Sequence, residues 1–329
     1  MNKKDKNTQV TVLGAGAWGT SFATLLAHNG FNVKLWCFEQ NVAHDIQKHR
    51  INHTYLPNIK LSSNIHVTSD LEDALRDSSW VFEAVPVTFL RKTLMQAKFF
   101  TRPEQQWVVL SKGIEQDSFL LPSQIIQDVF GFNTCAVIAG PNFAKELAVG
   151  AYTATTVASN NNQIAQELSD MLANEFFKPY ISDDMIGAQV GGAIKNVFAL
   201  AIGMSKGSGL HENTIAFILT QALQEIAQLI EFFGGKKETV YGLSGLGDML
   251  LTCTSPISKN FQAGMLLGKG SKLADIEKIM TLPEGINTTQ SLFQIIQKNN
   301  LNLPLCRGIY EVIFEHASVE TIYKNIFRV

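Results

Sequence analysis

A glycine-rich run near the start of the chain constrains the fold more than any other feature of the sequence. Residues 9–13 (QVTVL) form a short apolar run typical of a buried strand, and residues 14–19 (GAGAWG) follow at once. Residues 20–28 then place apolar side chains at helical spacing, and Gly30 ends that pattern. A strand, a G-x-G-x-x-G turn and a helix in this order predict the first βαβ unit of a parallel sheet.

The three glycines of this turn have separate expected roles. Gly14 allows the tight turn, Gly16 lets a pyrophosphate approach the backbone, and Gly19 lets the helix pack closely on the strand. The N-terminus of the helix adds free N–H groups and a partial positive charge, which favour an anion. The run therefore predicts a dinucleotide-binding site, with a glycine-rich turn that binds nothing as the alternative.

Glu39 follows Gly19 at the spacing expected of a residue that binds the ribose of a dinucleotide, at the end of a second predicted strand over residues 32–38. A carboxylate here accepts hydrogen bonds from the 2′-hydroxyl of NAD and repels the 2′-phosphate of NADP. Phe38 and residues 40–42 contain no cation. This strand end favours NAD, unless Glu39 is an ordinary solvated loop acid.

Strand and helix patterns alternate along the first half of the chain. Further strands are predicted over residues 80–85, 107–110 and 134–138, with helices over residues 89–99 and 121–129. Such alternation is typical of parallel βαβ units covered on both faces.

The second half of the chain has helical periodicity and almost no strand pattern. Its clearest helix, residues 214–233, ends at the pair Gly234-Gly235. We therefore expect an α/β protein in which residues 1–188 form an N-terminal Rossmann-type doubly wound sheet. Residues 189–329 are expected to form an all-α domain.

Composition excludes several classes of protein. The chain has 27 Lys and Arg residues against 29 Asp and Glu, a near balance that argues against a nucleic-acid-binding protein. The four cysteines contain no C-x-x-C pair, which argues against a disulfide framework and a zinc site. They are Cys37, Cys135, Cys253 and Cys306.

The N-terminus shares one feature with signal peptides, because three lysines precede an apolar stretch over residues 10–27. Glycines interrupt that stretch and no convincing cleavage site follows it. Elsewhere no run of about 18 uninterrupted apolar residues occurs, so no membrane span is expected. We expect a cytoplasmic protein.

Lys195 interrupts an apolar helical run, residues 191–201 (GGAIKNVFALA). It shares one helical face with small residues, including Gly192 and Ala199. Burial of an ammonium group lowers its pKa, as a catalytic acid/base needs. A lysine that reaches solvent from the edge of the helix is the alternative.

Three further segments carry polar groups at places where ligands bind. Residues 242–260 contain Asp248 and end in Ser258-Lys259-Asn260, at a predicted helix start. These three residues suit the binding of a phosphate, and a capping cluster is the alternative. Lys112 and the run at residues 140–144 each follow a predicted strand, at the edge where open α/β sheets bind ligands.

Histidines at positions 44, 49 and 53 raise the question of a metal site. No carboxylate completes the set in the manner of H-E-x-x-H, and Leu56-Pro57 indicates a loop. We expect no bound metal.

Taken together, these blocks resemble bacterial-type NAD(P)-dependent glycerol-3-phosphate dehydrogenases over nearly the whole chain. The blocks are GAGAWGT (14–20), SKGIE (111–115), GPNFAKE (140–146), GGAIKNVFA (191–199), GLGDMLLTC with SKN (245–260) and PEG (283–285). That family reversibly reduces dihydroxyacetone phosphate to sn-glycerol 3-phosphate for phospholipid synthesis, usually as a homodimer. The resemblance implies the same reaction, NAD or NADP as cofactor, and a homodimer here.

The resemblance also implies roles for individual residues. Lys195 matches the general acid/base of the family. Substrate-contacting positions are matched by Lys112, Gly140, Asn142, Lys195, Asp248, Ser258, Lys259 and Asn260. Cofactor-contacting positions, besides Gly14, Gly16 and Gly19 of the turn, are matched by Ala17, Trp18, Phe38, Tyr55, Lys112, Ala144, Lys259, Leu282 and Glu284.

The chain departs from the family pattern at a few of these positions. Lys259 replaces the usual Arg, so a point charge takes the place of a forked donor and the bidentate grip on a phosphate is lost. Phe38 stands where Arg or His is common, which weakens any expectation of strict NADP preference. Asn142 and Pro283 replace the commoner Ser or Thr and Val.

Two alternative functions are weighed against this one. A related 3-hydroxyacid or 6-phosphogluconate-type dehydrogenase would lack the GLGD and SKN block. A non-catalytic nicotinamide-binding sensor would keep the glycines but would have no reason to keep Lys195 and Asp248.

Overall fold

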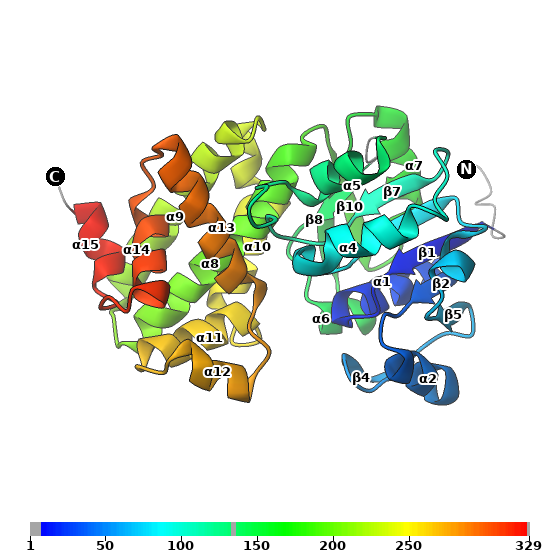
Figure 1. The fold of residues 1–329 in the computed structure, drawn as a ribbon, viewed down its shortest axis with the longest axis horizontal. Helices are drawn as coiled ribbons and strands as arrows, with labels where there is room; N and C mark the ends of the chain where they lie inside the picture. The colour runs from blue at the N-terminus through cyan, green and yellow to red at the C-terminus, as the bar shows by residue number, and fades with distance from the viewer. Residues whose placement is uncertain (1–7, 133–135, 328–329) are drawn as a thin grey trace. The chain divides into compact units, whose positions relative to one another are not determined.

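The computed structural model describes residues 8–132 and 136–327, and the chain divides into two compact units. Unit 1 spans Met1–Ser111 and Pro122–Met185, and unit 2 spans Lys112–Leu121 and Ile186–Val329. Figure 1 shows strands and helices in the first unit and helices in the second. The three N-terminal lysines and Cys135 lie outside the described residues.

Unit 1 alternates strands with helices. Its strands are β1 (Gln9–Leu13), β2 (Asn32–Trp36), β3 (Ile51–Asn52), β4 (Leu56–Lys60), β5 (Ile65–Thr68), β6 (Trp80–Glu83), β7 (Gln106–Val109), β8 (Ala136–Ala139), β9 (Thr153–Ala158) and β10 (Phe177–Ser182). Its helices are α1 (Ala17–His28), α2 (Gln40–His49), α3 (Leu71–Leu75), α4 (Val87–Ala97), α5 (Pro122–Phe130), α6 (Ala144–Ala148) and α7 (Asn162–Leu172).

One eight-stranded sheet organises this unit, in the order β10-β9-β8-β7-β6-β1-β2-β5. The first strand pairs in parallel with β2 on one side and β6 on the other. Val10 and Val12 are fully buried in the same apolar cluster as Phe22 and Leu26 of α1, and Thr11 between them is buried as well, as expected of a strand covered on both faces. The predicted fold class is confirmed.

One pairing differs from the expected parallel order, because β9 runs antiparallel to β8. A parallel crossover needs a connection long enough to return along the sheet. The connection after β8 contains only the five-residue helix α6, so the chain re-enters the sheet from the carboxyl edge of β8. Strands β9 and β10 were not predicted, and residues 134–135 of the predicted strand 134–138 lie outside the described residues.

The described residues of unit 2 contain helices, turns and the loop of residues 112–121, and no strand. Its α-helices are α8 (Met185–Gly207), α9 (Glu212–Phe232), α10 (Asp248–Thr254), α11 (Lys259–Gly268), α12 (Leu273–Ile279), α13 (Glu284–Asn299), α14 (Pro304–Phe314) and α15 (Thr321–Phe327). A 3₁₀ turn, η1 (Lys237–Tyr241), and a π-helical turn, η2 (Leu243–Gly247), precede α10. The predicted end of α9 is correct, since Gly234 has φ +88° and its neighbour Gly235 donates to the Ile230 carbonyl.

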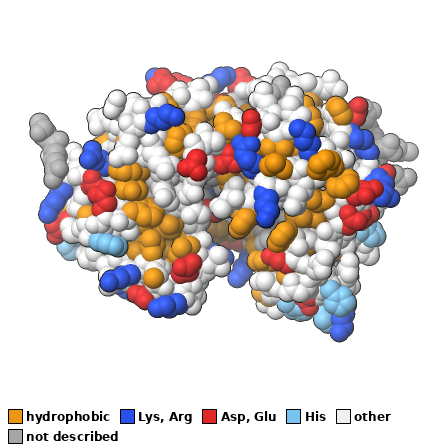
Figure 2. Space-filling model, in the orientation of Figure 1, with side chains coloured by type: hydrophobic (Ala, Val, Ile, Leu, Met, Phe, Trp, Pro, Cys, Tyr) orange, Lys and Arg blue, Asp and Glu red, His pale blue; other side chains and the backbone are white. Residues whose placement is uncertain are grey.

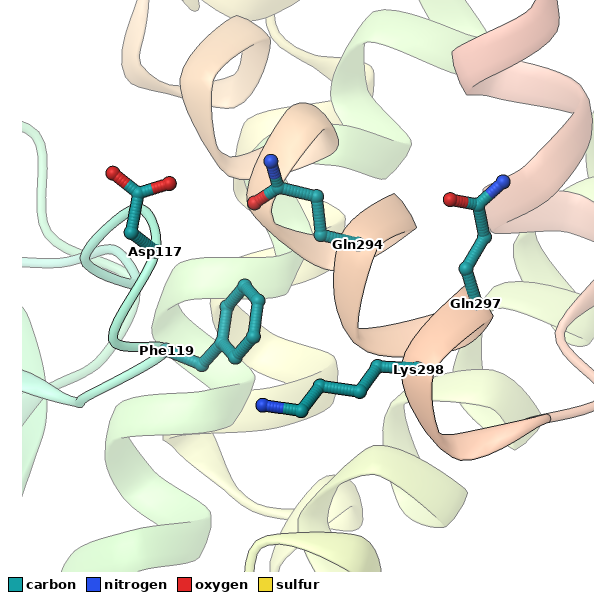
Figure 3. A pocket seen from close by; sticks show the side chains of 5 residues that line it. All are labelled: Asp117, Phe119, Gln294, Gln297 and Lys298. Atoms are coloured by element: carbon teal, nitrogen blue, oxygen red, sulfur yellow. The ribbon is translucent and has the colours of Figure 1, made fainter.

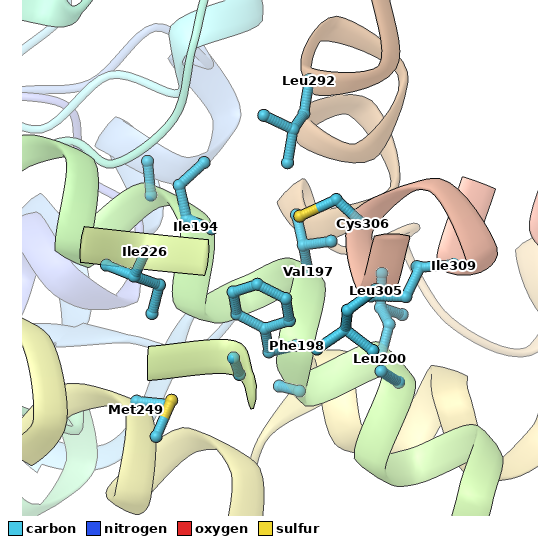
Figure 4. Close-up of a cluster of buried hydrophobic side chains, with 14 of the residues drawn as sticks. Ile194, Val197, Phe198, Leu200, Ile226, Met249, Leu292, Leu305, Cys306 and Ile309 are labelled. Atoms are coloured by element: carbon cyan, nitrogen blue, oxygen red, sulfur yellow. The ribbon is translucent and has the colours of Figure 1, made fainter. Parts of the chain in front are cut away.

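The core of unit 2 surrounds α8, which starts at Met185, shortly before the boundary predicted between residues 188 and 189. Val197, Phe198 and Leu200 are fully buried there, together with Leu305 of α14 (Figure 4). By length and composition α8 and α9 are both apolar enough to cross a membrane. However, 94% of the apolar window of α8 is buried inside the structure, as expected of a core helix, against 39% for α9.

Candidate functional site

The glycine turn has the geometry that dinucleotide binding requires. Gly14 has φ +111°, and a Cβ there would lie 2.7 Å from the Ala84 carbonyl oxygen. A Cβ on Gly19 would lie 1.9 Å from the Gly14 carbonyl oxygen, so only glycine lets α1 approach the turn this closely. These two positions fix the turn itself.

Gly16 is different, because nothing lies within 4 Å of a Cβ built on it. It is the N-cap residue of α1, and no side chain of the described residues caps this helix end. The first N–H groups of α1 therefore face open space, which a diphosphate can occupy. The indole Nε1 of Trp18, in the first turn, is buried and has no hydrogen-bond partner in the described part of the chain. The residues present fit a dinucleotide.

Asn52 holds this turn in place, a role that cannot be inferred from the sequence because the partners of Asn52 lie far from it along the chain. Its buried amide Nδ2 donates to the Ala15 carbonyl at 2.8 Å and to Thr20 Oγ1 at 2.9 Å. Its Oδ1 accepts from the backbone N–H of Tyr55 at 3.0 Å. Through Asn52, the short β3–β4 hairpin is tied to the glycine turn.

The end of β2 carries Glu39 within reach of Tyr55. The Tyr55 hydroxyl donates to Glu39 Oε1 at 2.6 Å, and this bond to a carboxylate raises the pKa of Tyr55 to about 12. Phe38 is 70% exposed beside it. The second carboxylate oxygen of Glu39 lies 3.8 Å from Cys37 Sγ, a weak partner. Glu39 is thus oriented by Tyr55 and keeps capacity to accept from a sugar hydroxyl.

Gly140, Asn142 and Ala144 follow β8 in unit 1. Asn142 Nδ2 donates to the Ala154 carbonyl at 2.9 Å, and its Oδ1 accepts from Thr155 Oγ1 at 3.0 Å. The Ala144 carbonyl accepts from Ser21 Oγ of α1 at 2.7 Å. These bonds shape the loop, and contact of its residues with a substrate or cofactor stays a prediction.

In unit 2, one buried carboxylate joins the two lysines singled out in the sequence. Lys195 Nζ of α8 donates to Asp248 Oδ1, and Lys112 Nζ donates to Asp248 Oδ2 at 2.6 Å. The Asp248 side chain is fully buried, while those of Lys195 and Lys112 are 9% and 18% exposed. Two lysines share this carboxylate, and Glu284 also interacts electrostatically with both of them.

The pKa of Lys195 is lowered to about 8. Burial is the largest cause, Asp248 opposes it, and the neighbouring charge of Lys112 lowers the pKa further. A group with a pKa this close to neutrality can both give and take a proton, as a general acid/base must. The alternative of a lysine reaching into solvent from the helix edge is wrong.

Small residues allow the lysines to meet Asp248. The π-helical turn η2 ends where α10 begins, so Asp248 is the first residue of that helix. A Cβ on Gly191 would lie 2.6 Å from the Ser244 carbonyl oxygen of η2, so α8 packs directly on this turn. Gly192 faces the aliphatic stem of Lys112, whose Cδ would lie 3.5 Å from a Cβ there.

A chain of buried amides lies beside this cluster. Asn260 Nδ2 donates to Asn196 Oδ1 at 3.0 Å, and Asn260 Oδ1 accepts from the Gly285 N–H at 3.0 Å. Asn260 therefore links α8, α11 and α13. Asn196 and Gly285 lie in the GGAIKNVFA and PEG blocks, but neither residue type indicates such a link, so the sequence predicts no role for them.

The Ser258-Lys259-Asn260 block is in part a capping cluster, which is the alternative to a phosphate site. Ser258 is buried and its Oγ accepts from the Phe261 N–H at 3.3 Å as the N-cap of α11. Lys259 is exposed and forms no ion pair with any described residue. A cation in the first turn of a helix opposes the helix dipole, so Lys259 gains nothing locally from its place. Leu282 is half-buried, and Glu284 is exposed at the start of α13.

A shallow pocket in unit 2 contains none of the predicted site residues (Figure 3). It is lined by Asp117, Phe119, Gln294, Gln297 and Lys298, where the Lys298 ammonium lies 5.5 Å from the centre of the Phe119 ring. This pocket does not contribute to the arrangement around Lys195.

The chain contains both a dinucleotide-type glycine turn and a buried lysine whose lowered pKa suits proton transfer. This combination is typical of nicotinamide-dependent dehydrogenases. That is the class of protein that this fold and these residues define.

Comparison with known proteins places the chain more narrowly. Residues 9–165 match the family described as NAD-dependent glycerol-3-phosphate dehydrogenase N-terminus, and residues 184–324 match the corresponding C-terminus. The chain belongs to the NAD-dependent glycerol-3-phosphate dehydrogenase family. It is an enzyme, an NAD(P)-dependent oxidoreductase, as the sequence predicted.

Individual relatives agree over nearly full length. A protein from Bacillus subtilis named glycerol-3-phosphate dehydrogenase, NAD(P)+, is 38% identical over 328 residues, or 97% of this chain and 93% of the relative. One of the same name from Carboxydothermus hydrogenoformans is 38% identical over 309 residues, or 93% of this chain and 92% of the relative. The crystal structure of glycerol-3-phosphate dehydrogenase from Coxiella burnetii superposes with a TM-score of 0.94 at 31% identity, covering 98% of this chain and 100% of that one.

Proposed function

We propose that this chain catalyses the reversible reduction of dihydroxyacetone phosphate to sn-glycerol 3-phosphate, with Lys195 as the general acid/base. The observation that carries this proposal is the buried cluster of Lys112, Asp248 and Lys195 in a chain of this family. The cluster provides a proton donor of lowered pKa and a second cation, which together suit a phosphorylated ketone.

Each residue of the cluster has a part in the reaction. NADH or NADPH, when bound, supplies the hydride that the C2 carbonyl carbon accepts. As negative charge develops on the carbonyl oxygen, Lys195 donates an Nζ proton to it, and in the oxidation direction Lys195 takes that proton back. Asp248 holds both lysines through its two oxygens, and Lys112 adds positive charge where the alkoxide forms.

The remaining residues position the two ligands. Ser258, Lys259 and Asn260 hold the substrate phosphate, with the exposed Lys259, which forms no ion pair among the described residues, as its main cation, and Gly140 and Asn142 contact the substrate. The turn of Gly14, Gly16 and Gly19 would hold the pyrophosphate. The other cofactor contacts come from Ala17, Trp18, Phe38, Tyr55, Lys112, Ala144, Lys259, Leu282 and Glu284.

The first experiment is to follow the loss of NADH or NADPH absorbance with purified protein and dihydroxyacetone phosphate. Turnover with either cofactor supports the proposal. The ratio of kcat/KM between the cofactors reports on Glu39, and the Tyr55–Glu39 arrangement favours NADH. Cofactor binding without turnover would contradict the proposal and favour a sensor, whereas turnover of a 3-hydroxyacid alone would favour the related dehydrogenases.

We further propose that the enzyme acts in the cytoplasm, supplies glycerophospholipid synthesis and forms a homodimer through its helical C-terminal domain. The helix α9 supports this assembly, because its sequence is apolar while only 39% of its apolar window is buried within the single chain.

A further inference from the structure

Three potential metal ligands meet on the surface of unit 1, and none of them is among the residues proposed to contact substrate or cofactor. His49 Nδ1 lies 2.8 Å from Asp45 Oδ1, and His53 Nδ1 lies 2.9 Å from Asp45 Oδ2. One ligand atom from each residue lies within 4.8 Å of the other two. Figure 2 shows histidine side chains gathered over α2, at the lower right of this view.

These are the donor types that zinc and similar ions prefer. Imidazole nitrogens and a carboxylate oxygen bind Zn²⁺ at about 2.0–2.2 Å, so neighbouring ligand atoms in a tetrahedral set lie about 3.4 Å apart. The observed separations of 2.8 and 2.9 Å need to open by only a fraction of an ångström. In the structure each Nδ1 lies within hydrogen-bond distance of the Asp45 carboxylate, which only accepts, so Nδ1 carries the imidazole proton there. An ion would bind to the tautomer that carries the proton on Nε2, in which the Nδ1 lone pair is available.

The backbone around the cluster is fixed, so the three side chains do not need to be gathered by the ion. Asp45 and His49 face each other one turn apart on α2. Arg50 then takes φ +58° and ends the helix, and its guanidinium donates to the Ile65 carbonyl at 2.9 Å. The fully buried Asn52 anchors the chain just before His53. Such pre-ordering lowers the entropy cost of binding.

The spacing of the histidines predicts no metal site, because the chain has no carboxylate placed as in H-E-x-x-H. Asp45 lies before His49 instead, and the turn at Arg50 returns His53 to the same carboxylate. We propose that Asp45, His49 and His53 bind one divalent transition-metal ion of the zinc type, with water at the open positions. The ion would tie α2 to the β3–β4 hairpin.

The test is calorimetric titration of the full chain with ZnCl₂, comparing the unmodified protein with His49→Ala, His53→Ala and Asp45→Asn. We expect one ion per chain, and an affinity at least about tenfold weaker in each variant. His44→Ala is the matched control, because His44 is an exposed histidine of the same helix outside the cluster, and its affinity should be unchanged.

Co²⁺ provides a second readout. We expect visible d–d absorption without a thiolate charge-transfer band, because the proposed site contains no cysteine and the three cysteines among the described residues, Cys37, Cys253 and Cys306, are buried. The proposal fails if the unmodified protein binds no zinc, if His49→Ala binds as tightly as His44→Ala, or if the cobalt complex shows thiolate ligation. Circular dichroism of each variant confirms that a loss of binding is not a loss of folding.

Discussion

At the scale of single residues, the proposed chemistry depends on the buried charges around Asp248. This carboxylate accepts from both lysines in a buried setting, and Glu284 also interacts electrostatically with both of them. Burial and the charge of Lys112 lower the pKa of Lys195, while Asp248 opposes the shift and keeps it near 8. A proton can therefore leave Lys195 at a pH at which an exposed lysine keeps it.

This pKa predicts opposite pH profiles for the two directions of the reaction. Reduction needs protonated Lys195, so its kcat should be constant below about pH 8 and fall above it; oxidation needs the neutral amine and should rise through the same region. Asp248→Asn removes the group that stabilises the ammonium, so the fall in reduction rate should move to lower pH. Asp275→Asn, at an exposed carboxylate of α12, is the control. An unchanged profile in Asp248→Asn would contradict this account.

Lys259 provides a second prediction at this scale. Its ammonium is a single point charge, whereas an arginine offers two parallel donors to a phosphate. Lys259→Arg should lower the KM for dihydroxyacetone phosphate by roughly threefold to tenfold, about 0.7–1.4 kcal/mol, with little change in kcat. Steady-state kinetics measure this, with Lys269→Arg at the other end of α11 as control. An unchanged or higher KM would show that the phosphate is not held by this residue.

At the scale of elements, glycine substitutions at the N-terminus of α1 should distinguish an effect on packing from an effect on ligand binding. Gly16→Ala places a methyl group in open space and should change the free energy of unfolding by less than about 1 kcal/mol. It should nevertheless weaken NADH binding by at least about tenfold, because the methyl group lies where the diphosphate approaches. Fluorescence titration with NADH and urea unfolding measure the two effects.

Gly19→Ala is the matched comparison, since its Cβ would lie 1.9 Å from the Gly14 carbonyl oxygen. It should destabilise the protein by about 1–3 kcal/mol or more, because backbone must move. If Gly16→Ala binds NADH normally, the diphosphate does not lie over this glycine.

A buried acid from α9 caps α14. The carboxylate of Glu225 accepts from the backbone N–H groups of Leu305 and Cys306 at 2.7 and 2.9 Å, and burial raises its pKa. Glu225→Ala would leave both donors unsatisfied and should cost about 2–4 kcal/mol in urea unfolding. Gln224→Ala, at the exposed neighbour on the same helix, should cost less than about 0.5 kcal/mol. Equal effects would show that the cap contributes nothing.

At the scale of the whole molecule, each unit has its own apolar core, and α9 buries a much smaller share of its apolar window than α8 does, 39% against 94%. A homodimer would cover such a surface. Light scattering after size exclusion should give twice the chain mass of 36.3 kDa. Replacing partly exposed apolar residues of α9, such as Leu223→Lys, should shift the protein toward the monomer. A monomeric unmodified protein would contradict the proposed assembly.

Some features of the whole molecule could be predicted from the sequence, and others could not. The strand over residues 9–13, the end of α9 and the fold class were predicted, because side-chain periodicity and glycine conformation are properties of neighbours along the chain. The antiparallel entry of β9 was not predicted, because strand direction depends on where the connection after β8 can pack. Asn52 and Asp45 were missed for a related reason, since their partners come from other elements or follow a turn.

By itself, then, the sequence determined the α/β class, the glycine turn, the helical second half and the residue types on which the chemistry depends. These follow from local sterics and hydrophobic period, which any single segment carries within itself. Only the tertiary structure decided that the two oxygens of Asp248 accept hydrogen bonds from Lys195, 53 residues away, and from Lys112, 136 residues away. Burial and charge pairing exist only between packed elements, so a pKa suited to catalysis is a property of the fold and not of the lysine.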